Sequence, residues 1–213
     1  MKLLILKLEL RKDKFLLAEA LKEDCKKLSI KYSPTIAYLL RKKYLIRILR
    51  GVFYIKSIEE RKFNKTNISH YEALKKAFEL KGVKNWYFGL DTAVKLNNLT
   101  HEYFTTDYVI SDSIFRPKPI NVMGHIVKFI KLKKKLLKFG IITKEVNFSD
   151  PEKTFLDIIY LDKYKGFSEE TIKSKVEDMI ATLFKKRVRR YLKHYPLSVR
   201  RLVRRMQWYQ KNS

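Results

Sequence analysis

The sequence predicts an α+β protein in which an N-terminal winged helix-turn-helix precedes a mixed domain with a small β-sheet and C-terminal helices. Two apolar, alternating runs on either side of Arg50-Gly51 have the pattern of a β-hairpin. Two stretches with helical spacing come directly before that hairpin. Short β-branched or aromatic runs and further helical patterns follow it. These three observations set the order of the elements.

The first predicted helix covers residues 13–28, whose apolar side chains recur at close to helical spacing. It contains Cys25, the only cysteine, so an internal disulfide is excluded and a small buried hydrophobe is the better interpretation. The second helix is predicted to begin with Ser33 as N-cap and Pro34 at its first position, and to run to about Lys43. Its inward face is expected to hold Ile36, Leu39 and Leu40.

The hairpin is predicted from the runs 44–48 and 52–55, which alternate apolar and polar or aromatic residues. Gly51 tolerates the positive φ that a tight turn needs. Arg47 and Arg50 therefore lie near the tip of the hairpin. Residues 1–60 then form the winged-helix DNA-binding domain.

Residues 61–213 are predicted to form the second, α+β domain, after a polar linker over residues 57–67. It should begin with a helix over residues 68–81 that Gly82 ends. The aromatic cluster from Trp86 to Gly89 and a short helix through Ala93 and Leu96 come next. Strands are predicted at residues 106–112, 125–132 and 141–147, with Arg116-Pro117-Lys118-Pro119 as a boundary between two of them.

The C-terminal part reads as helices. Ser149-Asp150-Pro151 combines an N-cap with a proline and predicts a helix start, and Ser168 predicts another. Residues 181–213 contain no acidic residue and are expected to form a basic tail of two helices that break near Tyr195-Pro196. Their apolar stripes are Phe184, Val188, Tyr191 and Leu192 in the first helix, and Val199, Leu202, Val203 and Met206 in the second.

The net charge of the chain indicates which partners it favours. The chain has 213 residues, a formal net charge of +26 and a pI near 10.0, which favours polyanionic partners and nucleic acid first among them. The apolar run from Leu3 to Leu8 is interrupted by Lys7 and is too short to span a bilayer. We therefore expect a cytoplasmic protein with no membrane partner.

The second helix and the hairpin are the predicted surface for double-stranded DNA, because the major groove admits one α-helix. Thr35 and Tyr38 are expected to face bases or sugars, the cations of the helix to meet phosphates, and the hairpin arginines to reach a minor groove. The predicted DNA-binding residues are Ser33, Thr35, Tyr38, Arg41, Lys42, Lys43, Arg47 and Arg50. Alternatives are a winged helix that binds only proteins, and a basic tail that contacts nucleic acid, docks on an acidic protein or is merely solvated.

Catalysis finds little support in the sequence, and we predict no catalytic residue, metal or cofactor. His70, His101, His125 and His194 are scattered without metal-ligand spacing, and there is no phosphate-binding or dinucleotide-binding glycine loop. A metal-dependent nuclease targeted by the winged helix is an alternative that would use charged residues near strands. Those residues are Asp107, Asp112, Lys144 and Glu145, for which ordinary strand-edge charges are the commoner explanation.

An ordered set of short motifs resembles a known family. The hairpin contains Leu49-Arg50-Gly51-Val52-Phe53-Tyr54, and Trp86-Tyr87-Phe88-Gly89-Leu90-Asp91-Thr92-Ala93 and Leu96-Asn97-Asn98-Leu99-Thr100 follow it. The last motif is Ser149-Asp150-Pro151-Glu152-Lys153-Thr154-Phe155-Leu156-Asp157. Over about residues 15–160 this order resembles the AbiEi-type antitoxins and related transcriptional regulators.

The resemblance implies an antitoxin of a type IV toxin–antitoxin pair. Such proteins bind operator repeats through the winged helix and repress their own operon. Their second domain counteracts a nucleotidyltransferase-like toxin without requiring a stable complex. Thr154 and Asp157 lie three apart on the predicted helix, and we expect them to cap or brace the structure rather than to act in catalysis. The basic tail and the long stretch between Thr100 and Asp150 depart from the family pattern. An architectural or RNA-binding basic protein is the remaining alternative.

Overall fold

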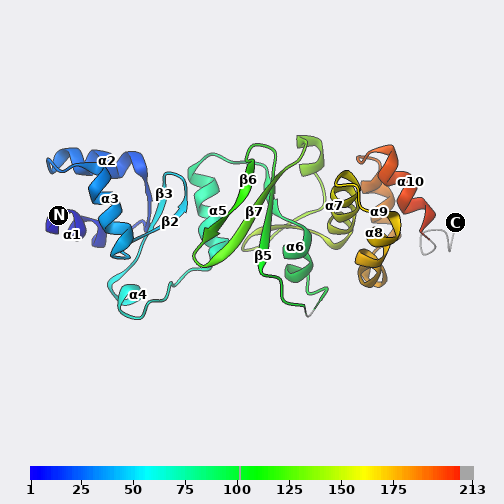
Figure 1. Cartoon of the computed structure of the whole chain (residues 1–213), viewed down its shortest axis with the longest axis horizontal. Helices are drawn as coiled ribbons and strands as arrows, with labels where there is room; N and C mark the ends of the chain where they lie inside the picture. The colour runs from blue at the N-terminus through cyan, green and yellow to red at the C-terminus, as the bar shows by residue number, and fades with distance from the viewer. Residues whose placement is uncertain (101, 207–213) are drawn as a thin grey trace. The chain divides into compact units, whose positions relative to one another are not determined.

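The computed structural model describes residues 1–100 and 102–206 of the chain (Figure 1). It divides into two compact units. The first holds Met1–Lys84 together with Asn121–His125, and the second holds Asn85–Ile120 and the chain from Ile126 onward. The boundary expected at residue 60 lies inside the first unit, because the helix after it packs on the sheet of that unit. Each unit is described separately below.

The first unit is a winged helix-turn-helix followed by two further helices (Figure 1, blue to cyan). Its three strands pair antiparallel in the order β1-β3-β2. The elements are α1 (Lys2–Glu9), β1 (Phe15–Leu17), α2 (Ala18–Lys27), α3 (Tyr32–Arg41), β2 (Leu45–Leu49), β3 (Val52–Ile55), α4 (Ile58–Lys62) and α5 (His70–Leu80). Gly51 has φ +79° at the hairpin turn and Gly82 has φ +66° after α5, as the sequence predicted.

Two local expectations in this unit were wrong. Residues 15–17 form a strand rather than helix, because they complete the ladder of β3, with Leu16 opposite Phe53. Helix α3 begins one residue before Ser33, with Lys31 as N-cap and no side-chain cap. Ser33 and Pro34 thus lie inside the first turn, where a proline costs little because the first backbone N–H groups of a helix have no partner within it.

The expected linker over residues 57–67 is ordered around a buried carboxylate. Ser57 and Glu60 form a reciprocal capping box at the start of α4. Glu60 also accepts hydrogen bonds from the Tyr54 hydroxyl at 2.8 Å and from the Asn67 backbone N–H at 2.6 Å. Burial alone would raise the pKa of Glu60, but these hydrogen bonds outweigh it and hold the pKa below its ordinary value. The segment is therefore anchored to the end of β3.

The second unit contains a mixed sheet whose strands lie in the order β6-β7-β5-β4-β9-β8. Strand β4 pairs antiparallel with β5 and parallel with β9, and β5 pairs parallel with β7. The strands are β4 (Trp86–Phe88), β5 (Thr106–Ser111), β6 (Arg116–Val122), β7 (His125–Lys131), β8 (Ile141–Thr143) and β9 (Asn147–Ser149). Helix α6 (Leu90–Leu96) follows β4, and a 3₁₀ turn, η1 (Lys134–Leu137), follows β7.

The predicted strands at residues 106–112 and 125–132 are confirmed as β5 and β7, whereas residues 141–147 are split between β8 and β9. The Arg116–Pro119 stretch, expected to be a boundary, belongs to β6. Strand β6 is at the edge of the sheet, and an edge is where a strand can contain Pro117 and Pro119, which lack a backbone donor.

The C-terminal helices cover a core that they share with the sheet (Figure 1, yellow to red). They are α7 (Pro151–Tyr164), α8 (Glu169–Val176), the 3₁₀ helix η2 (Glu177–Thr182), α9 (Lys185–Leu192) and α10 (Leu197–Arg205). Asp150 and Ser168 are N-caps as predicted, and the break near Tyr195-Pro196 is confirmed. Phe184 was expected in the apolar stripe but is 67% exposed, because it precedes α9 as its N-cap. Residues 207–213 of the predicted tail lie outside the described residues.

Over residues 1–100 and 102–206, every helix is too short or too polar to cross a membrane.

Candidate nucleic-acid interface

The segment from α3 through the hairpin has an unusual charge. Residues 25–58 contain nine Lys and Arg and no Asp or Glu. Arg41, Lys42 and Lys43 lie at the C-terminal end of α3, and Arg47 and Arg50 lie on and next to β2. All five side chains are exposed. The end of one helix and its neighbouring hairpin therefore present cations that no acidic residue in the segment neutralises.

Lys43 is held in an unfavourable backbone conformation. It has φ +57°, and the Lys43 and Tyr44 N–H groups donate to the carbonyls of Leu40 and Leu39, at 3.1 and 2.9 Å. This pattern is a Schellman motif, whose left-handed position usually holds glycine. A side chain there costs about 1–2 kcal/mol. The chain places a lysine at this position, and its ammonium donates to the Asn64 side chain at 2.9 Å.

Thr35 was expected to face DNA, but it is only 2% exposed. It packs against Cys25 in the core between α2 and α3, and burial raises the pKa of the Cys25 thiol, which hydrogen-bonds to Thr35. Thr35 is therefore a core residue. Tyr38 is half-buried and its ring stacks on that of Tyr44, with 6.3 Å between centroids. Ser33 is exposed in the first turn of α3.

The hairpin arginines differ in their surroundings. The Arg47 guanidinium lies 5.9 Å from the centroid of the Phe53 ring, on the strand opposite. The pairing of β2 with β3 shifts register between Arg47 and Leu49, and such a bulge redirects the side chains at the end of a hairpin. Arg50 occupies the turn itself and is exposed. Both guanidinium groups are accessible to a phosphate or to a groove.

The motif at residues 149–157 forms a buried polar network in the second unit. The Lys153 ammonium donates to the Leu136 carbonyl at 2.7 Å and pairs with Asp157 at 3.2 Å, and neither side chain is exposed. Asp157 also accepts hydrogen bonds from the hydroxyls of Tyr87 at 2.7 Å and Tyr195 at 2.6 Å. Burial lowers the pKa of Lys153 and raises those of both tyrosines. With no access to solvent, this network braces the fold.

The other acids of the motif hold the basic tail. Asp150 accepts a hydrogen bond from the Tyr191 hydroxyl at 2.9 Å. Glu152 is fully buried and accepts from the Phe184 backbone N–H and from Arg187, both at 3.0 Å. The bracing role expected of this motif thus extends to the tail helices.

Asp107 and Asp112 of the nuclease alternative are too far apart to share a metal ion. Asp107 and Asp112 are five residues apart along and just beyond strand β5, which at 3.3 Å per residue separates them by roughly 16 Å. Two metal ions that share a phosphate lie only about 4 Å apart. The Asp112 carboxylate accepts a hydrogen bond from the Asn85 amide at 2.6 Å. Lys144 and Glu145 are exposed in the turn between β8 and β9.

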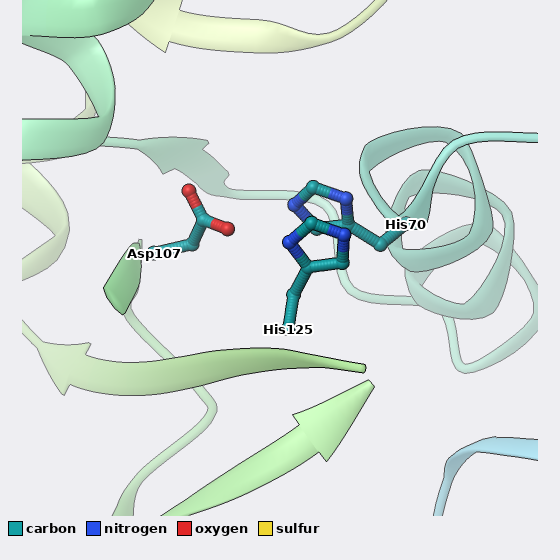
Figure 2. Close-up of side chains that lie close together, drawn as sticks. All are labelled: His70, Asp107 and His125. Atoms are coloured by element: carbon teal, nitrogen blue, oxygen red, sulfur yellow. The ribbon is translucent and has the colours of Figure 1, made fainter. Parts of the chain in front are cut away.

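Two histidines that seemed scattered in the sequence lie together. The rings of His70 and His125, both in the first unit, stack with 3.6 Å between centroids and 9° between planes (Figure 2). The 54 intervening residues hide this pair from any spacing rule. Asp107, also drawn there, belongs to the second unit, where it accepts from the Thr92 hydroxyl at 3.3 Å. His101 lies outside the described residues.

The tail helices are strongly amphipathic. Val188, Tyr191 and Leu192 of α9 are buried, as are Val199, Leu202 and Val203 of α10. The exposed cations on the other faces are Lys186, Arg189, Arg190, Lys193, Arg201, Arg204 and Arg205. The tail is folded over the described residues, and its basic face is a second surface that a polyanion could contact.

Comparison with known proteins gives a fold likeness. No family model matches the sequence, and no curated protein matches it. Among solved structures, the crystal structure of the RV2827C protein from Mycobacterium tuberculosis is similar, with a TM-score of 0.61 and 11% sequence identity. The match covers 97% of this chain and 75% of that one. At this identity the likeness concerns the fold.

Proposed function

We propose that this protein is a DNA-binding antitoxin that represses its own operon through the winged helix and counteracts a nucleotidyltransferase-like toxin. The observation that carries the DNA-binding part is the exposed, acid-free cationic surface on α3 and the hairpin, made by Arg41, Lys42, Lys43, Arg47 and Arg50. The antitoxin part rests on the motif resemblance described above. Ser33 and Tyr38 are further candidates for contact with DNA, whereas Thr35 is buried and does not belong to this surface.

The architecture supports contact with double-stranded DNA. In helix-turn-helix proteins the second helix of the motif enters the major groove, and here that helix is α3. Cations at its end and on the hairpin meet phosphates on either side of the groove, and these contacts set position and salt dependence. The left-handed Lys43 fits this proposal, since strained positions concentrate at functional sites.

The test compares two variants of the full-length chain with equal loss of charge. One replaces Arg41, Lys42, Arg47 and Arg50 with Ala. The control replaces four exposed lysines elsewhere in the first unit, which are Lys2, Lys12, Lys62 and Lys81. Both reduce the net charge of +26 by four, so non-specific attraction falls alike.

Gel-shift titrations at several salt concentrations use DNA from upstream of the gene. We expect the interface variant to lose specific binding and its salt slope to flatten by about one unit for each phosphate contact removed. The control should keep the specific complex. Equal affinities for the two variants would refute the proposed interface.

The antitoxin part is tested in cells with the same two chains. Each is co-expressed with the product of the neighbouring gene, which the proposal expects to be a nucleotidyltransferase-like toxin, and growth is scored together with an operator reporter. We expect the interface variant to lose repression and to retain protection, because the four substitutions leave the second unit unchanged. A folded wild-type chain that gives no protection would refute the antitoxin assignment and leave the DNA-binding proposal standing.

A further inference from the structure

A hollow of about 610 Å³ lies in the first unit beside the hairpin. Its wall runs from the C-terminal end of α3 along β2, includes the residue that follows β3 and the segment after α4, and is completed by Met123 and Gly124. The polar residues that line it are Lys43, Arg47, Lys56, Asn64, Lys65 and Thr66. Its volume is within the range of pockets that bind small molecules, about 300–1,000 Å³.

All the charged residues that line the hollow are positive. Four of its lining residues are Lys or Arg, and none of the described residues that line it is acidic. Four cations around one small volume repel one another unless anions separate them. A ligand with a single negative charge would neutralise only part of this excess. The arrangement therefore favours a ligand with several negative charges close together.

Lys56 distinguishes this hollow from an exposed patch of basic residues. It lines the hollow although only 3% of the residue is exposed. Its backbone N–H donates to the Tyr44 carbonyl, but its ammonium forms no hydrogen bond or ion pair with another residue of the described ranges. The stem of Lys56 is covered while its ammonium lines the hollow, where a bound anion would supply the charged partner that it lacks.

The charged groups around Lys56 do not supply that partner. Glu60 is the acidic group whose charge acts on it, but the hydrogen bonds to Glu60 come from Tyr54, Ser57 and Asn67. Lys43 and Arg61 add positive charge. Burial, together with these two cations, lowers the pKa of Lys56.

We propose that this hollow binds a small ligand through a diphosphate or longer phosphate chain, with Lys56 at its base and Lys43, Arg47 and Lys65 around it. A guanidinium can bind phosphate oxygens in a bidentate manner and ammonium groups act as point charges beside it. A duplex presents its phosphates on a convex surface, which suits the exposed arginines of the hairpin better than a nearly buried lysine. The site shares Lys43 and Arg47 with the proposed DNA surface, whereas Lys56 and Lys65 belong to the hollow alone.

The probe for the test is inorganic pyrophosphate. Its binding to the full-length protein is measured by isothermal titration calorimetry and by thermal unfolding, against sodium chloride of equal ionic strength. The test variant is Lys56→Met, which keeps the length and apolar volume of the side chain. The control is Lys62→Met, which removes an exposed lysine of α4 that does not line the hollow.

We expect pyrophosphate to bind and to raise Tm in the wild type and in Lys62→Met. In Lys56→Met its affinity should fall at least about tenfold, since a charged hydrogen bond contributes about 1.5–3 kcal/mol. Without ligand, the Tm of Lys56→Met should equal or exceed that of the wild type, which shows that the variant is folded and that Lys56 is not a structural residue.

Three results would overturn the proposal. The first is a wild-type Tm that pyrophosphate raises no more than sodium chloride does. The second is equal pyrophosphate affinity in the two variants. The third is displacement of pyrophosphate by a DNA duplex, combined with loss of duplex affinity in Lys56→Met, which would make the ligand a phosphate of the DNA backbone.

Discussion

Replacing Lys43 with Gly should make the protein more stable and a weaker DNA binder. Lys43 has φ +57°, and the left-handed conformation costs an L-residue about 1–2 kcal/mol. Glycine loses more backbone entropy on folding, about 0.5–1 kcal/mol, and the exposed Lys43–Asn64 hydrogen bond contributes a few tenths. The net expectation is a stabilisation of about 0.5 kcal/mol, with one phosphate contact fewer.

Ser29→Gly is the matched control. Ser29 has φ +53° after α2 and is held by the same motif, with the Ile30 N–H donating to the Cys25 carbonyl at 3.0 Å. It carries no charge, so its replacement should stabilise the fold to a similar extent without changing the salt slope of DNA binding. Urea denaturation measures the stability and gel-shift titration at several salt concentrations measures the slope.

Two outcomes separate the steps of this reasoning. If Lys43→Gly destabilises the chain while Ser29→Gly stabilises it, the Lys43 side chain stabilises the fold by more than the backbone cost of its positive φ. If both variants are more stable and their salt slopes match that of the wild type, Lys43 does not contact phosphate.

Two further predictions concern buried carboxylates. Asp157→Ala should lower the free energy of unfolding by about 3–5 kcal/mol in urea denaturation, because it leaves a buried ammonium without its partner. The control Asp178→Ala, at an exposed position, should change this free energy by no more than about 0.5 kcal/mol. Similar losses in the two variants would contradict the bracing role. The folded pKa of Glu60 is below its ordinary value of 4.5, so its stabilisation is complete above that pH and is lost as the pH falls through the folded pKa. Glu60→Gln should therefore show a shallower loss of stability in urea denaturation below pH 4.5, and an unchanged pH profile would refute this assignment.

The sequence predicted correctly the turns and helix starts that are determined by neighbouring residues. The hairpin follows from Gly51 between two apolar runs, and the start of α7 follows from Asp150 and the proline after it. In both cases the residues that determine the geometry are adjacent in the sequence. The same holds for the N-cap of α8 at Ser168.

Features that depend on distant partners could not be found in this way. An apolar stretch such as residues 15–17 fits a strand or a helix equally well, and its pairing with β3, more than thirty residues later, decides between them. Thr35 lies on the face of α3 that meets Cys25, which only the packing of α2 on α3 reveals. The hollow is likewise built from four separate segments, so no spacing in the sequence marks it.

Acidic residues of earlier helices offset the positive charge of the basic tail. Residues 181–213 contain no acid, so helices α9 and α10 would repel each other unless charge from elsewhere offset them. That charge comes from earlier helices: Glu152 binds Arg187, and Glu169 binds Arg205 at 2.7 Å. Of the two, Glu152 is fully buried, and its second oxygen holds the backbone at the start of α9.

Glu152→Gln should therefore loosen the tail before it affects the rest of the protein. The amide keeps the shape of the side chain but removes the charge that pairs with Arg187, and losing a charged hydrogen bond costs about 1.5–3 kcal/mol. Amide hydrogen exchange should accelerate by about tenfold or more in residues 185–192, while exchange in α5 of the first unit stays unchanged. Glu170→Gln, an exposed substitution in α8, is the control. Uniform acceleration across both units would mean that Glu152 supports global stability, and unchanged exchange in α9 would mean that its apolar stripe alone holds the tail.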